Sequence, residues 1–121
     1  MKKVLVFDDD EAIRMLYELE LSEEGYEVHC SGEASRCLEL IRNHSPSVVV
    51  MDKKMGKCDG LELLLKIRSQ FPALPLILCT AYSFYDSEKG EKAADFYAAK
   101  SSDLEDLKVK LKAAMKLRRA P

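Results

Sequence analysis

The chain has 121 residues, a length that fits one domain, and we expect residues 1–121 to form a single domain. Hydrophobic residues make up 47% of the sequence and charged residues 33%, a composition that argues against an intrinsically disordered chain. The formal net charge of −2 is too small to indicate binding to nucleic acid or to a membrane through charge alone.

Short apolar runs alternate along the chain with segments in which apolar residues recur at helical spacing. Val4-Leu5-Val6-Phe7 is the first short run, and its β-branched and aromatic residues are typical of a buried strand. The first helical segment runs from Glu11 to Glu24, and Gly25 follows it where a helix C-terminal glycine is common. The five predicted strands are residues 4–7, 26–30, 47–51, 74–79 and 96–99.

Two helices are predicted in the middle of the chain, with a polar loop between the third strand and the second of them. Ser31 or Gly32 has the chemistry of an N-cap for the first, which must stop before Pro46. Residues 52–60 are the polar loop, and the helix that follows begins near Leu61.

A last helix is predicted after the fifth strand, whereas residues 83–94 are poorly patterned. Ser102 and Glu105 have the spacing of a capping box for this helix. Its core-facing residues would be Leu104, Leu107, Leu111 and Ala114. We interpret its basic residues as a solvated face that suits the helix C-terminal dipole: Lys108, Lys110, Lys112, Lys116, Arg118 and Arg119.

Strands that alternate with helices predict an α/β fold in which a doubly wound, five-stranded parallel sheet carries helices on both faces. Sheets of this kind place their sites beyond the carboxyl ends of the strands. The residues that follow the predicted strands are chemically notable: Asp8-Asp9-Asp10, Asp52, Thr80 and Lys100. Because the strands are parallel, we expect these side chains to meet at one edge of the sheet.

This set of side chains has the chemistry needed for phosphoryl transfer to a carboxylate. Carboxylate oxygens suit Mg²⁺, and we expect Asp8 and Asp9 to hold that ion. Asp52 would act as the nucleophile, because a carboxylate can form an acyl phosphate. Thr80 and Lys100 would then bind the phosphoryl oxygens, since this reaction depends mainly on positioning and charge neutralisation.

The cysteines and histidines give no indication of a zinc site. Their spacing does not match that of zinc ligands, and none of the cysteines forms a CxxC pair. We interpret the cysteines as reduced, mostly buried small hydrophobic residues of a cytosolic protein. The six residues are Cys30, Cys37, Cys58, Cys79, His29 and His44. A signal peptide and a stretch of membrane-spanning length are both lacking, so we expect a cytoplasmic chain without a membrane partner.

Taken together, these motifs resemble the response-regulator receiver family of two-component signalling, which includes the chemotaxis regulators. The resemblance covers the run from Val4 to Glu11, the strand ending at Asp52, and the following loop, which the family usually writes Asp-x-x-Met-Pro-x-Met-Asp-Gly. Thr80-Ala81 matches the family's switch residue and the small residue after it, and Tyr97 stands three residues before Lys100, as the switch aromatic does.

The resemblance implies a flavodoxin-like sheet of strand order 2-1-3-4-5 and a phosphoprotein that takes its phosphoryl group on Asp52 from a sensor histidine kinase. It implies that the backbone carbonyl of Lys54 joins the metal ligands, and that Thr80 and Tyr97 move on phosphorylation. An output protein or domain would read that change. The resemblance does not imply direct nucleic-acid binding, or enzymatic activity beyond the chain's own phosphorylation and dephosphorylation.

Four departures from the family pattern leave the effect on switching open. Gly56 and Ser101 each replace a usual proline, and Lys53 and Lys54 directly follow the phosphoacceptor. The segment between Thr80 and Tyr97 is about two residues short, which predicts a short or displaced helix there.

Two alternatives remain in view, and the first of them is motivated by the two lysines after Asp52 and by the short segment between Thr80 and Tyr97. The first is a phosphorylation-independent pseudo-receiver, a module of the same fold that binds partners without being switched. The second is a phosphatase resembling the haloacid-dehalogenase family, because Asp8 and Asp10 have its Asp-x-Asp spacing, although Glu11 replaces the usual glycine.

Overall fold

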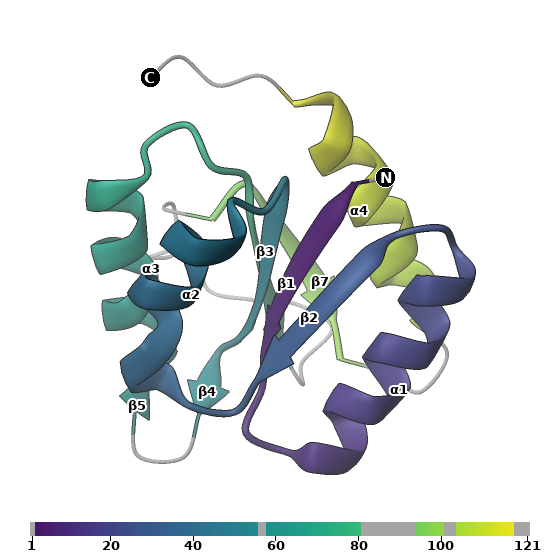
Figure 1. The fold of residues 1–121 in the computed structure, drawn as a ribbon, viewed down its shortest axis with the longest axis horizontal. Helices are drawn as coiled ribbons and strands as arrows, with labels where there is room; N and C mark the ends of the chain where they lie inside the picture. The colour runs from purple at the N-terminus through teal and green to yellow at the C-terminus, as the bar shows by residue number, and fades with distance from the viewer. Residues whose placement is uncertain (1, 56–57, 81–93, 101–103, 118–121) are drawn as a thin grey trace.

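The computed structural model describes residues 2–55, 58–80, 94–100 and 104–117, and these form a parallel sheet between two layers of helices (Figure 1). The sheet strands are β1 (Lys3–Phe7), β2 (Glu27–Ser31), β3 (Val48–Asp52), β6 (Leu76–Thr80) and β7 (Phe96–Ala99). Their order is β2-β1-β3-β6-β7, and every neighbouring pair is parallel. Counted along the five sheet strands, this is the predicted order 2-1-3-4-5.

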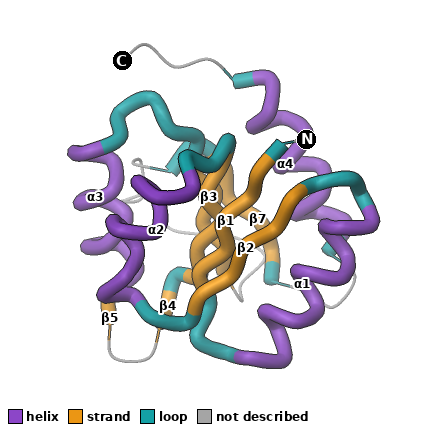
Figure 2. Tube along the Cα trace, viewed as in Figure 1, coloured by secondary structure: helices purple, strands orange, loops and turns teal. Residues whose placement is uncertain are grey.

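The helices divide between the two faces of the sheet. They are α1 (Glu11–Glu23), α2 (Cys37–His44), α3 (Gly60–Gln70) and α4 (Glu105–Lys116). Figures 1 and 2 show α1 and α4 on one face of the sheet and α2 and α3 on the other. The predicted doubly wound α/β fold is therefore confirmed for the described residues.

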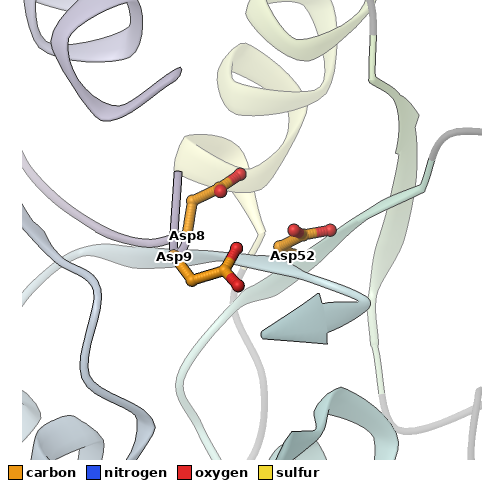
Figure 3. A group of neighbouring side chains, drawn as sticks. All are labelled: Asp8, Asp9 and Asp52. Atoms are coloured by element: carbon orange, nitrogen blue, oxygen red, sulfur yellow. The ribbon is translucent and has the colours of Figure 1, made fainter. Parts of the chain in front are cut away.

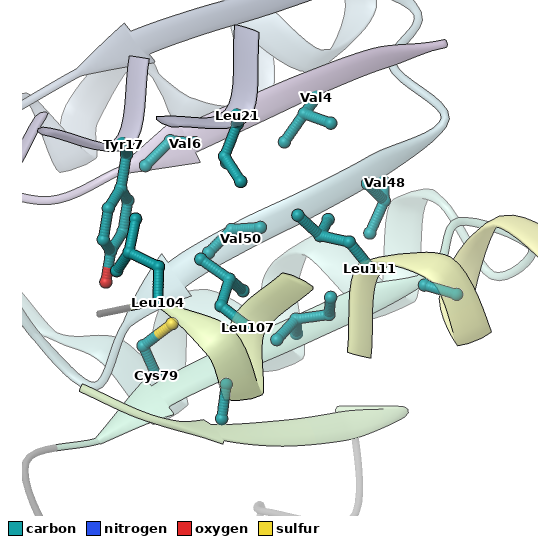
Figure 4. Packing of buried hydrophobic residues seen from close by; sticks show 13 residues of the cluster. Val4, Val6, Tyr17, Leu21, Val48, Val50, Cys79, Leu104, Leu107 and Leu111 are labelled. Atoms are coloured by element: carbon teal, nitrogen blue, oxygen red, sulfur yellow. The ribbon is translucent and has the colours of Figure 1, made fainter. Parts of the chain in front are cut away.

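Successive strand residues point to opposite faces, so each strand contributes to two separate cores. Val4 and Val6 of β1 belong to the core under α1 and α4, whereas Leu5 and Phe7 belong to the core under α2 and α3. Figure 4 shows the first of these cores, in which Tyr17 and other side chains of α1 and α4 pack on the valines of β1 and β3. Near-continuous apolar strands are what a sheet covered on both faces requires.

The first helix begins at Glu11 as predicted and ends at Glu23, one residue before the predicted end. Asp10 is its N-cap, and one carboxylate oxygen accepts hydrogen bonds from the N–H groups of Ala12 (2.9 Å) and Ile13 (3.3 Å). Gly25 lies beyond its C-terminus with φ 96°, a left-handed conformation that glycine adopts at little cost. This cap places Asp8 and Asp9 in the short turn between β1 and α1.

Two predictions about the middle of the chain were wrong in detail. The residues expected to be a polar loop contain β4 (Lys54–Met55) and β5 (Cys58–Asp59), which pair antiparallel. Strands of two residues are too short to show an apolar alternation in sequence. Neither Ser31 nor Gly32 caps the second helix, because a 3-10 turn, Ala34–Arg36, comes before α2.

The predicted capping box was also wrong for the last helix. Its N-cap is Leu104, which has φ 55° and makes no side-chain capping bond, and the helix itself begins at Glu105. Leu104 is buried in the core under α1 and α4, so burial of its side chain fixes this helix end. Ser102 lies outside the described residues. The four residues predicted to face the core are all buried: Leu104, Leu107, Leu111 and Ala114.

Several predictions fall on residues that the structure does not describe. These are Gly56, the Lys100–Ser101 bond and the helix expected between Thr80 and Tyr97. Among the described helices, none is both long enough and apolar enough to cross a membrane.

Candidate metal and phosphoacceptor site

Three aspartates meet at the carboxyl ends of the two central strands. Asp8 directly follows β1 and Asp52 is the last residue of β3, and the pairing of Phe7 with Met51 places them level with each other. Carboxylate oxygens of Asp8, Asp9 and Asp52 all lie within 4.8 Å of one another, as Figure 3 shows. Asp8 is 1% exposed and Asp52 8%, whereas Asp9 is exposed to solvent. The group is thus open on one side.

Lys100 brings a positive charge to this group from the edge of the sheet. Its ammonium nitrogen lies 2.8 Å from Oδ2 of Asp52 and 3.1 Å from Oδ2 of Asp8. The backbone N–H of Lys100 donates to the carbonyl of Thr80 (2.7 Å), and this bond fixes the main chain from which the Lys100 side chain extends. Burial of the ammonium group acts to lower the pKa of Lys100, but the hydrogen bonds and charges of Asp52 and Asp8 outweigh it and raise that pKa.

Asp8 is held by three hydrogen bonds, two of them to its main chain and one to its carboxylate. Its N–H donates to the carbonyl of Ser31 (3.1 Å), and its Oδ1 accepts from the N–H of Asp10 (3.0 Å). Its carbonyl accepts a hydrogen bond from Nη1 of Arg14 on α1 (2.8 Å). The sequence analysis missed Arg14, because an arginine on a helix is unremarkable until the fold brings it to the turn after β1.

The other predicted site residues are placed as follows. Thr80 is the buried last residue of β6, the strand next to β3. Tyr97 lies in β7 and packs against the core under α2 and α3, and its hydroxyl oxygen is buried. Lys54 begins β4, shortly after the end of β3, and its backbone pairs with Asp59. The structure thus brings Asp8, Asp9, Asp52 and Lys100 into one group. Thr80 and Lys54 lie at or just after the ends of neighbouring strands, whereas Tyr97 lies within β7, three residues before Lys100.

Two buried cysteines, Cys37 and Cys79, have thiols that favour the neutral form. All four cysteines are free, and burial raises the pKa of the Cys79 thiol to about 12 and that of Cys37 likewise to about 12. Burial also raises the pKa of Tyr17, whose side chain lies in the same core as Cys79. A thiol and a phenol with raised pKa values remain neutral, so Cys79, which pairs with Asp52 in the sheet, and Tyr17 add no charge to the acidic group.

The donor set fits a hard divalent cation. Three carboxylates face one ammonium group, which leaves negative charge that a cation can neutralise. Mg²⁺ favours oxygen ligands, is bound through a few carboxylates and keeps several waters, which suits a group with one exposed member. Asp8, Asp9 and Asp52 can therefore hold Mg²⁺ beside the carboxylate that would react.

Comparison with curated proteins identifies the relatives of this chain. Residues 4–112 match the model of the family described as "Response regulator receiver domain". The response regulator MprA of Mycobacterium sp. (strain KMS) is 34% identical over 116 residues, which cover 94% of this chain and 50% of MprA. The regulatory protein AtoC of Escherichia coli (strain K12) is 30% identical over 119 residues, which cover 97% of this chain and 26% of AtoC. The chain thus spans half or less of the length of these relatives.

Solved structures of response regulators resemble this chain in sequence and in fold. The response regulator TrrA of Thermotoga maritima in complex with Mg(2+)-BeF is 38% identical, with a TM-score of 0.87, and the match covers 94% of this chain and 99% of that one. The complex of the histidine kinase ThkA with TrrA includes a chain 37% identical, with a TM-score of 0.88, covering 96% of this chain and 100% of that one. Given its acidic group, its strand order and these relatives, the chain belongs to the response regulator receiver domain family.

Proposed function

We propose that this receiver domain accepts a phosphoryl group on Asp52 from a histidine kinase in a reaction that depends on Mg²⁺. The observation that carries the proposal is the group of three carboxylates within 4.8 Å, with the Lys100 ammonium 2.8 Å from Asp52. A nucleophile, a place for a divalent cation and a fixed positive charge are the components that phosphoryl transfer requires.

In this proposal Asp8, Asp9, Asp52 and the backbone carbonyl of Lys54 hold the ion. When bound, Mg²⁺ would neutralise negative charge on the phosphoryl oxygens. A carboxylate oxygen of Asp52 attacks the phosphorus, and the bond from phosphorus to the imidazole nitrogen of the kinase breaks. The imidazole leaves with the bonding electron pair and takes up a proton, and an acyl phosphate remains on Asp52. Water later attacks this acyl phosphate, which releases inorganic phosphate.

Lys100 and Thr80 are proposed to bind the phosphoryl oxygens once the acyl phosphate has formed. Lys100 already contacts Asp52, so a small movement of its ammonium group brings it to a phosphoryl oxygen. Thr80 then moves toward the phosphoryl group and Tyr97 moves further inward. This shifts the population toward a second state, because the phosphoryl group contacts the two states differently.

The partners follow from the same proposal. The complex of ThkA with TrrA supports a sensor histidine kinase as the phosphoryl donor. An output protein or domain would read the second state, while the chain itself would contact neither nucleic acid nor a membrane. We propose that residues 1–121 act as one domain in the cytoplasm. Its only catalysis would be its own phosphorylation and dephosphorylation.

Intact mass measurement tests the proposal. The protein is incubated with acetyl phosphate or phosphoramidate in the presence and absence of Mg²⁺, beside the variant Asp52→Asn. We expect a gain of one phosphoryl group that requires Mg²⁺ and is absent in the variant. A folded protein that binds Mg²⁺ but gains no mass would refute the proposal and favour a phosphorylation-independent interaction module.

A further inference from the structure

The backbone of Asp8 accepts a hydrogen bond from a cationic side chain that is not itself part of the acidic group. Arg14 lies in α1, six residues after Asp8, and its Nη1 donates to the Asp8 carbonyl at 2.8 Å. That carbonyl belongs to the peptide that links Asp8 to Asp9, two of the three carboxylates that can hold Mg²⁺. Among the ion pairs of the described residues, none joins Arg14 to these aspartates.

A glycine from a distant loop makes room for this guanidinium. A Cβ atom on Gly32, which follows β2, would lie 2.4 Å from Nη1 of Arg14 and 3.1 Å from its Cζ. Its distance to the carbonyl oxygen of Asp8 would be 3.4 Å, an ordinary contact. The φ of Gly32 is outside the left-handed range, so its backbone conformation does not require glycine. The absence of a side chain at position 32 therefore serves the Arg14 guanidinium.

We propose that Arg14, seated in the space beside Gly32, is a positioning residue for Mg²⁺ binding. Its hydrogen bond fixes the orientation of the peptide between Asp8 and Asp9, and thereby the directions in which both carboxylates leave the main chain. Groups that orient metal ligands in this way contribute strongly to metal affinity. The proposal rests on the proposed function for the location of the metal, but it concerns binding and not phosphoryl transfer.

Whether Mg²⁺ affinity rises or falls when Arg14 is removed distinguishes a positioning role from a purely electrostatic one. Arg14 carries a positive charge near the acidic group, so removing it would strengthen Mg²⁺ binding if charge alone mattered. If Arg14 orients the ligands, its removal weakens binding instead. Gly32→Ala provides a second approach, because it leaves the charge in place and displaces only the flexible end of the Arg14 side chain.

The experiment is a calorimetric titration of Mg²⁺ into the wild-type chain and into Arg14→Met, Gly32→Ala, the double variant and Arg14→Lys. The melting temperature of each variant is recorded as a check on folding. Arg42→Met is the matched control, because Arg42 donates to Gln70 between α2 and α3 and its loss removes the same charge. We expect about tenfold weaker binding for each single variant, the lower end of the range for groups that orient ligands.

The double variant gives the decisive result. We expect it to bind Mg²⁺ about as weakly as either single variant, because the added methyl group has no guanidinium to displace once Arg14 is gone. Arg14→Lys should recover part of the affinity, and Arg42→Met should match the wild type. Unchanged or tighter Mg²⁺ binding by Arg14→Met would overturn the proposal. So would a loss of affinity in the double variant equal to the product of the two single losses. If the wild type binds Mg²⁺ but accepts no phosphoryl group, the proposed function fails while this inference stands.

Discussion

Replacing Lys100 by methionine should make the stability of this domain depend much more strongly on Mg²⁺. The Lys100 ammonium is the fixed cation between Asp8 and Asp52, at 3.1 Å and 2.8 Å, and both carboxylates are nearly inaccessible to water. Removing one partner of a buried ion pair costs about 3–5 kcal/mol. The Lys100 side chain is 21% exposed, so we expect a loss near the lower value, about 3 kcal/mol, without a metal.

Mg²⁺ should restore more stability to Lys100→Met than it adds to the wild type. In the variant, the ion no longer competes with an ammonium group for the same carboxylate oxygens. Each tenfold gain in affinity adds about 1.4 kcal/mol of stabilisation when the ion is saturating. Urea unfolding followed by far-ultraviolet circular dichroism measures both quantities, and the chain contains no tryptophan that would serve as a fluorescent probe.

Lys110→Met is the matched control for this comparison. Lys110 forms an ion pair of 2.7 Å with Asp106 on the surface of α4, and pairs of this kind contribute about 0.5 kcal/mol or less. We expect its loss to change stability little and to leave the response to Mg²⁺ as in the wild type. Equal stabilisation of the wild type and Lys100→Met by Mg²⁺ would refute the view that Lys100 and the ion neutralise the same carboxylates.

Three further predictions concern the support of the site and of the sheet. Asp95→Asn should lose about 3 kcal/mol in urea unfolding, because the Asp95 side chain is only 6% exposed and forms an ion pair of 2.8 Å with Arg68; a loss below about 1 kcal/mol would contradict this. Gly60→Ala should lower the melting temperature, because a Cβ there would lie 2.3 Å from the carbonyl oxygen of Lys53; an unchanged melting temperature would show that the loop adapts freely. Burial, together with the neighbouring His29 and Lys3, lowers the pKa of His44 from 6.5. The unfolded chain therefore binds a proton at His44 more tightly than the folded chain does, so stability falls as the pH drops below about 6.5. In His44→Gln, melting temperatures at about pH 7.5 and about pH 5.5 should differ less than in the wild type, and an equal difference would count against this origin.

The sheet and the acidic group were predictable from sequence because each depends on local signals. The run Val4 to Phe7 is apolar throughout, and an acidic residue follows at the one place where a parallel sheet collects its strand ends. Once the strands were assigned, their parallel arrangement alone was enough to bring Asp8, Asp52 and Lys100 together. The grouping of these side chains could therefore be predicted without knowledge of how the helices pack on the sheet.

The features that sequence did not reveal depend on contacts between distant segments. The start of the last helix is fixed by burial of Leu104 against α1 and the sheet, and this outweighs the capping preference of nearby polar residues. The role of Arg14 depends on the space beside Gly32, which belongs to another loop. Only the fold shows that these two residues face each other across the turn after β1.

The position of Lys100 has a mechanical consequence for the sheet as a whole. Its side chain starts just after β7, one of the two edge strands, and reaches across β6 to the carboxylates of Asp52 at the end of β3 and Asp8 just after β1. The attraction between these charges therefore helps to hold the end of an edge strand against the centre of the sheet. Any event that changes the charge on Asp52 also changes this attraction, so how firmly β7 is held depends on the charge of a residue two strands away.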